Sequence, residues 1–112
     1  MKAKLRYAIK FVANMDNAVR FHRDTLGLPL RFQSPEWSEF ATDGVTLALH
    51  PASGKNPAGK VELGYVTQDL KEVYANREEI GIEFTSEPKP LHGVLLADIV
   101  DSEGARCGLG EE

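Results

Sequence analysis

The sequence predicts an α+β protein built from two tandem copies of one supersecondary unit. Residues 5–27 and residues 61–81 each read as a strand-like run, a helix-like run and then a glycine. In both copies a valine precedes the closing glycine by fifteen positions, and these pairs are Val12 with Gly27 and Val66 with Gly81. Self-similarity at a fixed offset is the signature of a duplicated unit. We therefore expect an internal duplication.

The length of 112 residues suits one domain of the commonest size. We expect a single domain over residues 1–112, with module one at 4–50 and module two at 61–112. The stretch 51–60 (PASGKNPAGK) holds two prolines and two glycines and no bulky apolar side chain, and we interpret it as the linker.

The elements of module one follow from periodicity and end signals. Apolar residues alternate over 5–12, which predicts a strand. Asn14 is a plausible N-cap for a following helix that ends before Gly27. Three further strands are then predicted, at 28–33, 37–41 and 45–50, with Asp43-Gly44 as the hairpin turn between the last two.

Module two repeats this order. Val61, Leu63 and Tyr65 share one face of its first strand. Asp69, with Glu72 three residues later, resembles a capping box, and the helix then continues to Ile80. Pro88 and Pro90 predict an open loop. Strands are predicted at 82–86, 94–100 and 105–109, with the last two forming a hairpin.

Each half therefore reads as strand-helix-strand-strand-strand, a βαβββ module. One such module leaves one face of its sheet bare, so we expect two modules to combine around a shared concavity. A concavity of this kind is the natural ligand site.

Composition excludes several classes of function. The net charge of −4 argues against nucleic acid, which binds to a basic stripe. No apolar run approaches a membrane span, and no basic amphipathic helix indicates a membrane surface. The single cysteine, Cys107, rules out an internal disulfide and suits a reducing cytoplasm. We expect Cys107 to be buried on the helix-covered face of its strand.

Two stretches carry a resemblance to a known family. Residues 14–28 read NMDNAVRFHRDTLGL, and Asp101-Ser102-Glu103-Gly104 stands near the end. The chain thereby resembles the vicinal oxygen chelate superfamily, which contains glyoxalase I, bleomycin-resistance proteins and extradiol dioxygenases. The resemblance covers the chain in order, duplication included. It implies a half-open mixed sheet around a ligand cavity, and very often a homodimer.

The resemblance also implies where a metal would bind. Metal-dependent members draw His or Glu ligands from the first and last strands of each copy, and the matching positions here are Tyr7, Ala48, Val61 and Gly108. A divalent ion prefers imidazole or carboxylate donors. A shift of one residue would offer Glu62, yet would not repair the other three positions. We interpret the chain as having lost the metal site, and we expect no cofactor.

Bleomycin-resistance proteins are the precedent for this fold without a metal. We therefore interpret the chain as a metal-free protein that sequesters a small organic molecule in an aromatic-lined cavity. Two alternatives stay open. One is an enzyme, either a metal-dependent lyase, isomerase or dioxygenase with displaced ligands, or a metal-free acid-base catalyst. The other is a structural dimer that binds nothing small.

Candidate ligand contacts begin with Trp37, the only tryptophan. Strand alternation places Trp37 and Glu39 on the cavity side and Phe40 in the core. An aromatic ring beside a carboxylate is a good site for a cation or a planar ring. The alternative is a tryptophan that fills the cavity or contacts a second copy. The other residues predicted to line the cavity are aromatic or aliphatic, namely Tyr7, Ile9, Phe11 and Tyr65.

Two histidines complete the candidates. His50 shares the face of Ala48 and is a weak candidate general base with Glu39, or a donor that orients a ligand. A hydrogen-bonded histidine at the rim is the alternative. His92 lies in the proline-rich loop, where it would contact a ligand at the cavity mouth. An unorthodox metal site of His50, His92 and Glu39 is conceivable, although their spacing does not support it.

Overall fold

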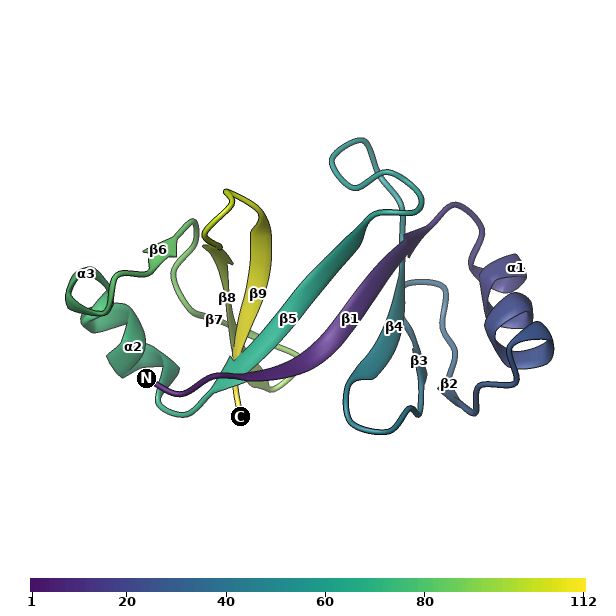
Figure 1. The fold of residues 1–112 in the computed structure, drawn as a ribbon, viewed down its shortest axis with the longest axis horizontal. Helices are drawn as coiled ribbons and strands as arrows, with labels where there is room; N and C mark the ends of the chain where they lie inside the picture. The colour runs from purple at the N-terminus through teal and green to yellow at the C-terminus, as the bar shows by residue number, and fades with distance from the viewer. The chain divides into compact units, whose positions relative to one another are not determined.

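The computed structural model describes every residue from Met1 to Glu112 and divides the chain into two compact units. The N-terminal unit is Tyr7–Glu62, and the C-terminal unit is Leu63–Glu112 together with Met1–Arg6. Figure 1 shows both with their elements labelled. The predicted α+β class is confirmed, with a mixed sheet in each unit. None of the helices is both long and apolar enough to span a bilayer.

The elements follow in the order strand, helix, then strands, twice. In the first half they are β1 (Lys4–Val12), α1 (Met15–Arg20), the π-helical η1 (Phe21–Thr25), β2 (Leu30–Phe32), β3 (Ser38–Phe40) and β4 (Thr46–Pro51). In the second half they are β5 (Val61–Thr67), α2 (Leu70–Ala75), α3 (Arg77–Ile80), β6 (Glu83–Phe84), β7 (Lys89–Leu91), β8 (Val94–Val100) and β9 (Arg106–Glu111).

The N-terminal unit has the strand order β2-β3-β4-β1, in which β1 runs parallel to β4 and the other pairs are antiparallel. Helix α1 covers one face of this sheet (Figure 1). Val19 from the helix meets Phe40 and Leu49 from the sheet, and all three are almost completely buried. The helix begins as predicted, because the Asn14 side chain accepts a hydrogen bond from the Asn17 N–H.

The C-terminal unit repeats this topology. Strand β5 runs parallel to β9, β9 is antiparallel to β8, and β6 and β7 both pair with β8. Its core lies between α2 and the sheet and is formed by Leu70, Val73, Ala97 and Leu109. Gly81 adopts a left-handed conformation with φ of 88° and closes the helical segment where the sequence predicted.

Two local predictions for this unit are wrong. Asp69 does not cap α2, because its backbone is left-handed (φ 52°), whereas an N-cap residue is normally extended. The Glu111 carboxylate from β9 accepts the Leu70 N–H instead, at 3.0 Å. The segment around Pro90 is not an open loop either. It forms β7 at the edge of the sheet, where the missing N–H of proline costs no ladder bond.

Candidate functional site

The uncovered face of the N-terminal sheet gathers most of the predicted ligand contacts. Strand register places Tyr7 opposite Thr46, Ile9 opposite Ala48 and Phe11 opposite His50. Glu39 of β3 lies opposite Ala48 on the other side of β4. Residues that pair directly across a sheet point to the same face. Phe40 alternates to the helix side and is fully buried there, as predicted.

Four rings on this surface contact one another, and we call them the aromatic face: Tyr7, Phe11, Trp37 and His50. The centroid of the Trp37 ring lies 5.8 Å from that of Tyr7 and 6.2 Å from that of His50. The His50 ring lies 5.3 Å from that of Phe11. The interplanar angles of 77°, 83° and 64° make all three contacts edge-to-face. This is a favourable arrangement for aromatic pairs.

Glu39 fixes the orientation of the Trp37 indole. The Trp37 Nε1–H donates to Glu39 Oε2 at 2.8 Å, and Arg31 Nη1 donates to Glu39 Oε1 at 3.0 Å. The Glu39 side chain is only 14% exposed. Both of its oxygens therefore accept from groups of the protein itself. Its charge is compensated by Arg31, so it differs from the open carboxylate that the sequence suggested.

Arg31 is a residue of this site that sequence reasoning missed. Its Nη1 also approaches Thr46 Oγ1 at 3.3 Å, which places the guanidinium beside the aromatic face. The strand register shifts between Leu30 and Phe32, so that Arg31 is the extra residue of a β-bulge. Bulges re-aim side chains and are frequent next to functional sites. The one available signal was a charged residue between two apolar ones in a short predicted strand.

His50 has a defined tautomer when it is neutral. Its Nδ1 lies 2.9 Å from the Pro51 carbonyl oxygen. A carbonyl only accepts hydrogen bonds, so Nδ1 carries the proton and donates it. The remaining nitrogen, Nε2, then has its lone pair available. His50 can therefore accept a hydrogen bond or a proton from a ligand on the aromatic face.

Three predicted positions lie elsewhere. Tyr65 was expected to face the cavity, but it packs under α2 against the core of Leu70 and Leu109. Val61 alternates with Tyr65 on the same face of β5, so it too is on the wrong side for a ligand position. His92 is exposed at the turn between β7 and β8 and belongs to the C-terminal unit.

Strand register aligns the first strands of the two units differently from the sequence. Ile9 pairs with Ala48 in the first unit, and Gly64 pairs with Gly108 in the second. If Ala48 corresponds to Gly108, then Tyr7 corresponds to Glu62 rather than to Val61. The four metal-ligand positions of the resemblance thus hold Tyr7, Ala48, Glu62 and Gly108.

This donor set does not fit a divalent ion, because it offers one carboxylate, one phenol, a methyl group and a hydrogen atom. No cluster of three His, Cys, Asp or Glu side chains with metal-binding geometry exists elsewhere in the structure.

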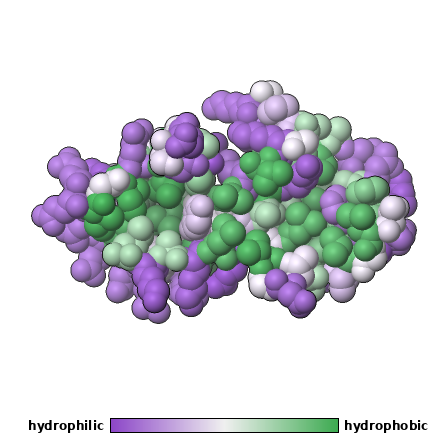
Figure 2. Space-filling model, in the orientation of Figure 1, coloured by the Kyte–Doolittle hydropathy of each residue, from purple (hydrophilic) through white to green (hydrophobic).

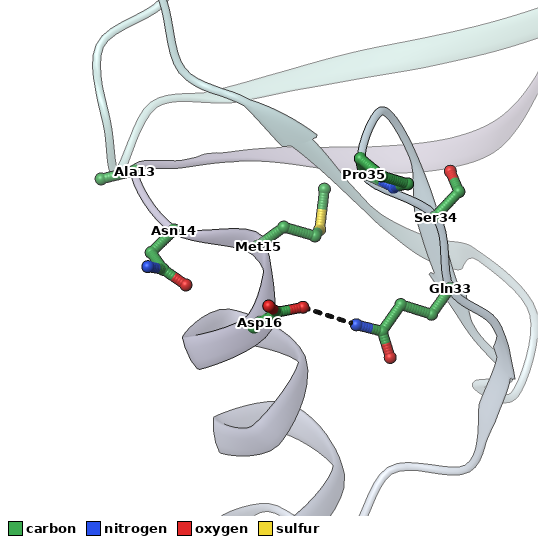
Figure 3. A pocket seen from close by; sticks show the side chains of 7 residues that line it. All are labelled: Ala13, Asn14, Met15, Asp16, Gln33, Ser34 and Pro35. Atoms are coloured by element: carbon green, nitrogen blue, oxygen red, sulfur yellow. Dashed lines mark hydrogen bonds between the residues drawn. The ribbon is translucent and has the colours of Figure 1, made fainter.

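An open cavity lies at the other edge of the N-terminal unit, between the start of α1 and the turn after β2 (Figure 3). Asp16 and Gln33 point toward each other across it, and Gln33 Nε2 donates to Asp16 Oδ1 at 3.0 Å. The Asn14 side chain is used as the helix cap. These polar groups satisfy one another, so this cavity is a weaker candidate than the aromatic face.

Solved structures with the same fold span nearly the full chain. A hypothetical protein from Bacillus halodurans is 17% identical with a TM-score of 0.78, and the alignment covers 100% of this chain and 96% of that chain. Streptomyces coelicolor methylmalonyl-CoA epimerase (S115T), in complex with 2-nitronate-propionyl-CoA, is 16% identical with a TM-score of 0.74, covering 97% and 94%. A glyoxalase/bleomycin resistance protein/dioxygenase superfamily member from Vibrio splendidus is 15% identical with a TM-score of 0.70, covering 99% and 100%.

At these identities the structural likeness shows the fold alone. No curated protein matches the sequence. The family model of the Glyoxalase/Bleomycin resistance protein/Dioxygenase superfamily, however, matches residues 4–104, which is most of the chain. Sequence match and fold agree, and this protein therefore belongs to the glyoxalase/bleomycin resistance protein/dioxygenase superfamily.

Proposed function

We propose that the protein binds a small planar organic molecule on the aromatic face, without a metal ion. The observation that carries this proposal is the Trp37 indole, which contacts two other rings and is held by Glu39. A ring fixed before binding loses little conformational freedom when a ligand stacks on it. Burying a planar ligand against such rings is favourable both through apolar area and through edge-to-face contacts.

The mechanism that we propose is sequestration rather than chemistry. Ile9 supplies apolar wall beside the rings, the buried Phe11 ring supports His50, and the neutral His50 Nε2 accepts a hydrogen bond that orients the ligand. The same fold holds a small organic ligand in the Streptomyces coelicolor epimerase, which supports a binding role for this scaffold. His92, which is exposed at a hairpin turn of the C-terminal unit, remains a separate candidate contact that we do not assign to the aromatic face.

Metal-free catalysis is a second candidate, and the tautomer of His50 favours it. With Nδ1–H held by Pro51, Nε2 faces away from that contact as a potential general base. Glu39 is a poorer base, because its two oxygens already accept from Trp37 and Arg31. This candidate predicts turnover that is lost in His50→Gln, whereas sequestration predicts binding alone.

We further propose that the protein acts as a homodimer in the cytoplasm. Large apolar side chains reach the surface of both units, and Figure 2 shows apolar surface on the face drawn there. Apart from Met1, those at least 46% exposed are Phe21, Leu26, Phe32, Val61, Leu91 and Val94. Light scattering coupled to gel filtration tests this, and a monomer at all concentrations would contradict it.

The binding proposal is tested by thermal shift with a broad library of aromatic compounds. We expect at least one compound to raise the melting temperature of the wild type and to lose this effect in Trp37→Leu. Phe21→Leu is the matched control, because Phe21 is 50% exposed on η1, outside the aromatic face. A library without a single hit, or full retention of binding in Trp37→Leu, would contradict the proposal.

The metal-free part of the proposal is tested by elemental mass spectrometry on untagged protein. We expect far less than one equivalent of any transition metal, even after incubation with Zn²⁺, Ni²⁺, Mn²⁺ and Fe²⁺. About one equivalent of a single metal, as a preformed ligand set would retain, would overturn this part.

A further inference from the structure

We propose that the ligand of the aromatic face is an organic anion, a planar ring with a carboxylate, and that Arg31 binds its charge. This inference rests on the proposed function, because it assigns a charge to the ligand of that same site. From the sequence, a carboxylate beside a tryptophan is a good site for a cation or a planar ring, and the present inference keeps the planar ring but replaces the cation with an anion.

Both oxygens of the Glu39 carboxylate already accept hydrogen bonds from the protein. Trp37 Nε1 donates to one of its oxygens at 2.8 Å and Arg31 Nη1 donates to the other at 3.0 Å. The side chain is 14% exposed, so a ligand has little access to it. A cation would have to displace the Arg31 guanidinium from this carboxylate, and it would release the indole as well. The structure therefore disfavours a cationic ligand.

Arg31 retains unused donors. Its Nη1 serves Glu39 and Thr46, whereas its Nε and Nη2 make no hydrogen bond within the chain. The side chain is 48% exposed. A guanidinium carries five N–H donors in one plane, and such a plane matches the two oxygens of a carboxylate. Arg31 thus compensates the negative charge of Glu39 through Nη1, and its other N–H donors remain available to an incoming anion.

The guanidinium lies at the border of the aromatic face. Thr46, which it contacts at 3.3 Å, is the direct strand partner of Tyr7. The Tyr7 ring in turn contacts Trp37. A ligand whose ring stacks within the aromatic face would therefore hold a carboxylate near Arg31. The bulge at Arg31 and its pair with Glu39 fix this donor before binding, which lowers the cost of ordering it.

The test uses three probes that share one ring system and differ in charge: 2-naphthoate, 2-naphthamide and 2-naphthylmethylammonium. Trp37 is the only tryptophan, so its indole N–H gives one peak in a ¹H–¹⁵N correlation spectrum, and titration yields a Kd for each probe. We expect naphthoate to bind about tenfold or more tightly than the amide, because hydrogen bonds to charged groups are the stronger ones. We expect the ammonium to bind most weakly.

Two variants separate charge recognition from folding. Arg31→Gln alone would leave the Glu39 charge without its partner, so the double variant Arg31→Gln/Glu39→Gln is the better test because it removes both charges together. In the double variant the ratio of the amide Kd to the acid Kd should fall to about one. Arg31→Lys keeps the charge but not the planar donors, and it should retain only part of the preference.

The outcomes distinguish this inference from the proposed function. Equal Kd values for the three probes in the wild type, or tightest binding of the ammonium, would overturn the charge assignment and leave the aromatic face as a binding site. An unchanged preference in the double variant would overturn the role of Arg31. An indole peak that none of the probes moves at about 1 mM would remove the proposed function, and the charge assignment with it.

Discussion

The two units share one strand topology, yet their uncovered sheet faces carry different chemistry. In the N-terminal unit this face holds four contacting rings and the Arg31–Glu39 pair. In the C-terminal unit Gly108 and Gly110 lie on the corresponding face, so these two positions carry no side chain there.

The aromatic residues of the C-terminal unit lie instead on its helix side. Tyr65 and Phe84 pack against the core under α2, and Tyr74 contacts Phe84 with ring centroids 4.9 Å apart. The difference teaches that the strand topology is common to both halves, whereas the residues proposed for recognition lie on one of them. Function is a property of the site that a fold carries.

The largest expected effect concerns the two cores. Phe40→Ala should lower the free energy of unfolding by about 3–5 kcal/mol, because it empties a fully buried position between α1 and the sheet. Leu109→Ala in the C-terminal core should cost about 2–5 kcal/mol. Urea denaturation measures both. A loss below about 1 kcal/mol in either variant would contradict the core assignment of that unit.

The second largest expected effect is a difference in stability between variants that remove a carboxylate from one or the other uncovered sheet face. Glu39→Ala removes the acceptor of the Trp37 indole and the partner of Arg31, and we expect a loss of about 1–3 kcal/mol. Asp98→Ala in the C-terminal unit breaks a pair with Arg106 whose side chains are 29% and 48% exposed, which should cost below about 1 kcal/mol. Denaturation with both variants in parallel tests this order, and equal losses would argue against a special role for Glu39.

Helix caps sharpen the same comparison. Asn14→Ala removes a local cap of α1, and Glu111→Ala removes a cap that reaches α2 from β9, so each should cost about 1 kcal/mol. Asp69→Gly is the contrast, since the Asp69 side chain makes no capping hydrogen bond and glycine tolerates the positive φ of this position. If Asp69→Gly also destabilised α2 as much as Glu111→Ala, the assignment of the cap to Glu111 would be wrong.

The smallest expected effect is a slight gain in stability, or no change. Asp69 has a positive φ of 52°, a conformation that glycine adopts without steric cost. Asp69→Gly should therefore leave the stability nearly unchanged or raise it by about 0.5 kcal/mol, with strain relief offset by the greater entropy of the unfolded chain. Thermal unfolding monitored by circular dichroism detects this shift.

Sequence periodicity predicted most of the architecture because it depends on local rules. The alternation of β1, the cap at Asn14 and the closing glycines Gly27 and Gly81 all follow from short-range geometry, and the structure confirms them. Residues 14–28, with Asp101-Ser102-Glu103-Gly104 and the order of the elements, suggested the family that the match over residues 4–104 shows.

The errors share a different cause, which is packing between distant segments. Alternation predicted that Val61, Leu63 and Tyr65 share a face, but only the core contacts reveal that Tyr65 lies under the helix. The bulge at Arg31 depends on its pairing with β3, and the cap of α2 comes from 41 residues away. No local pattern encodes these contacts, so the pair of Arg31 with Glu39 was invisible before the structure.

The single tryptophan has a practical consequence. All indole emission from this protein originates at Trp37, beside the rings of Tyr7 and His50. The protein therefore carries its own fluorophore at the proposed recognition surface, and no second indole contributes to the signal. Unlabelled protein can serve as an optical sensor for screening metabolite extracts, in which quenching or a spectral shift would report an occupant directly.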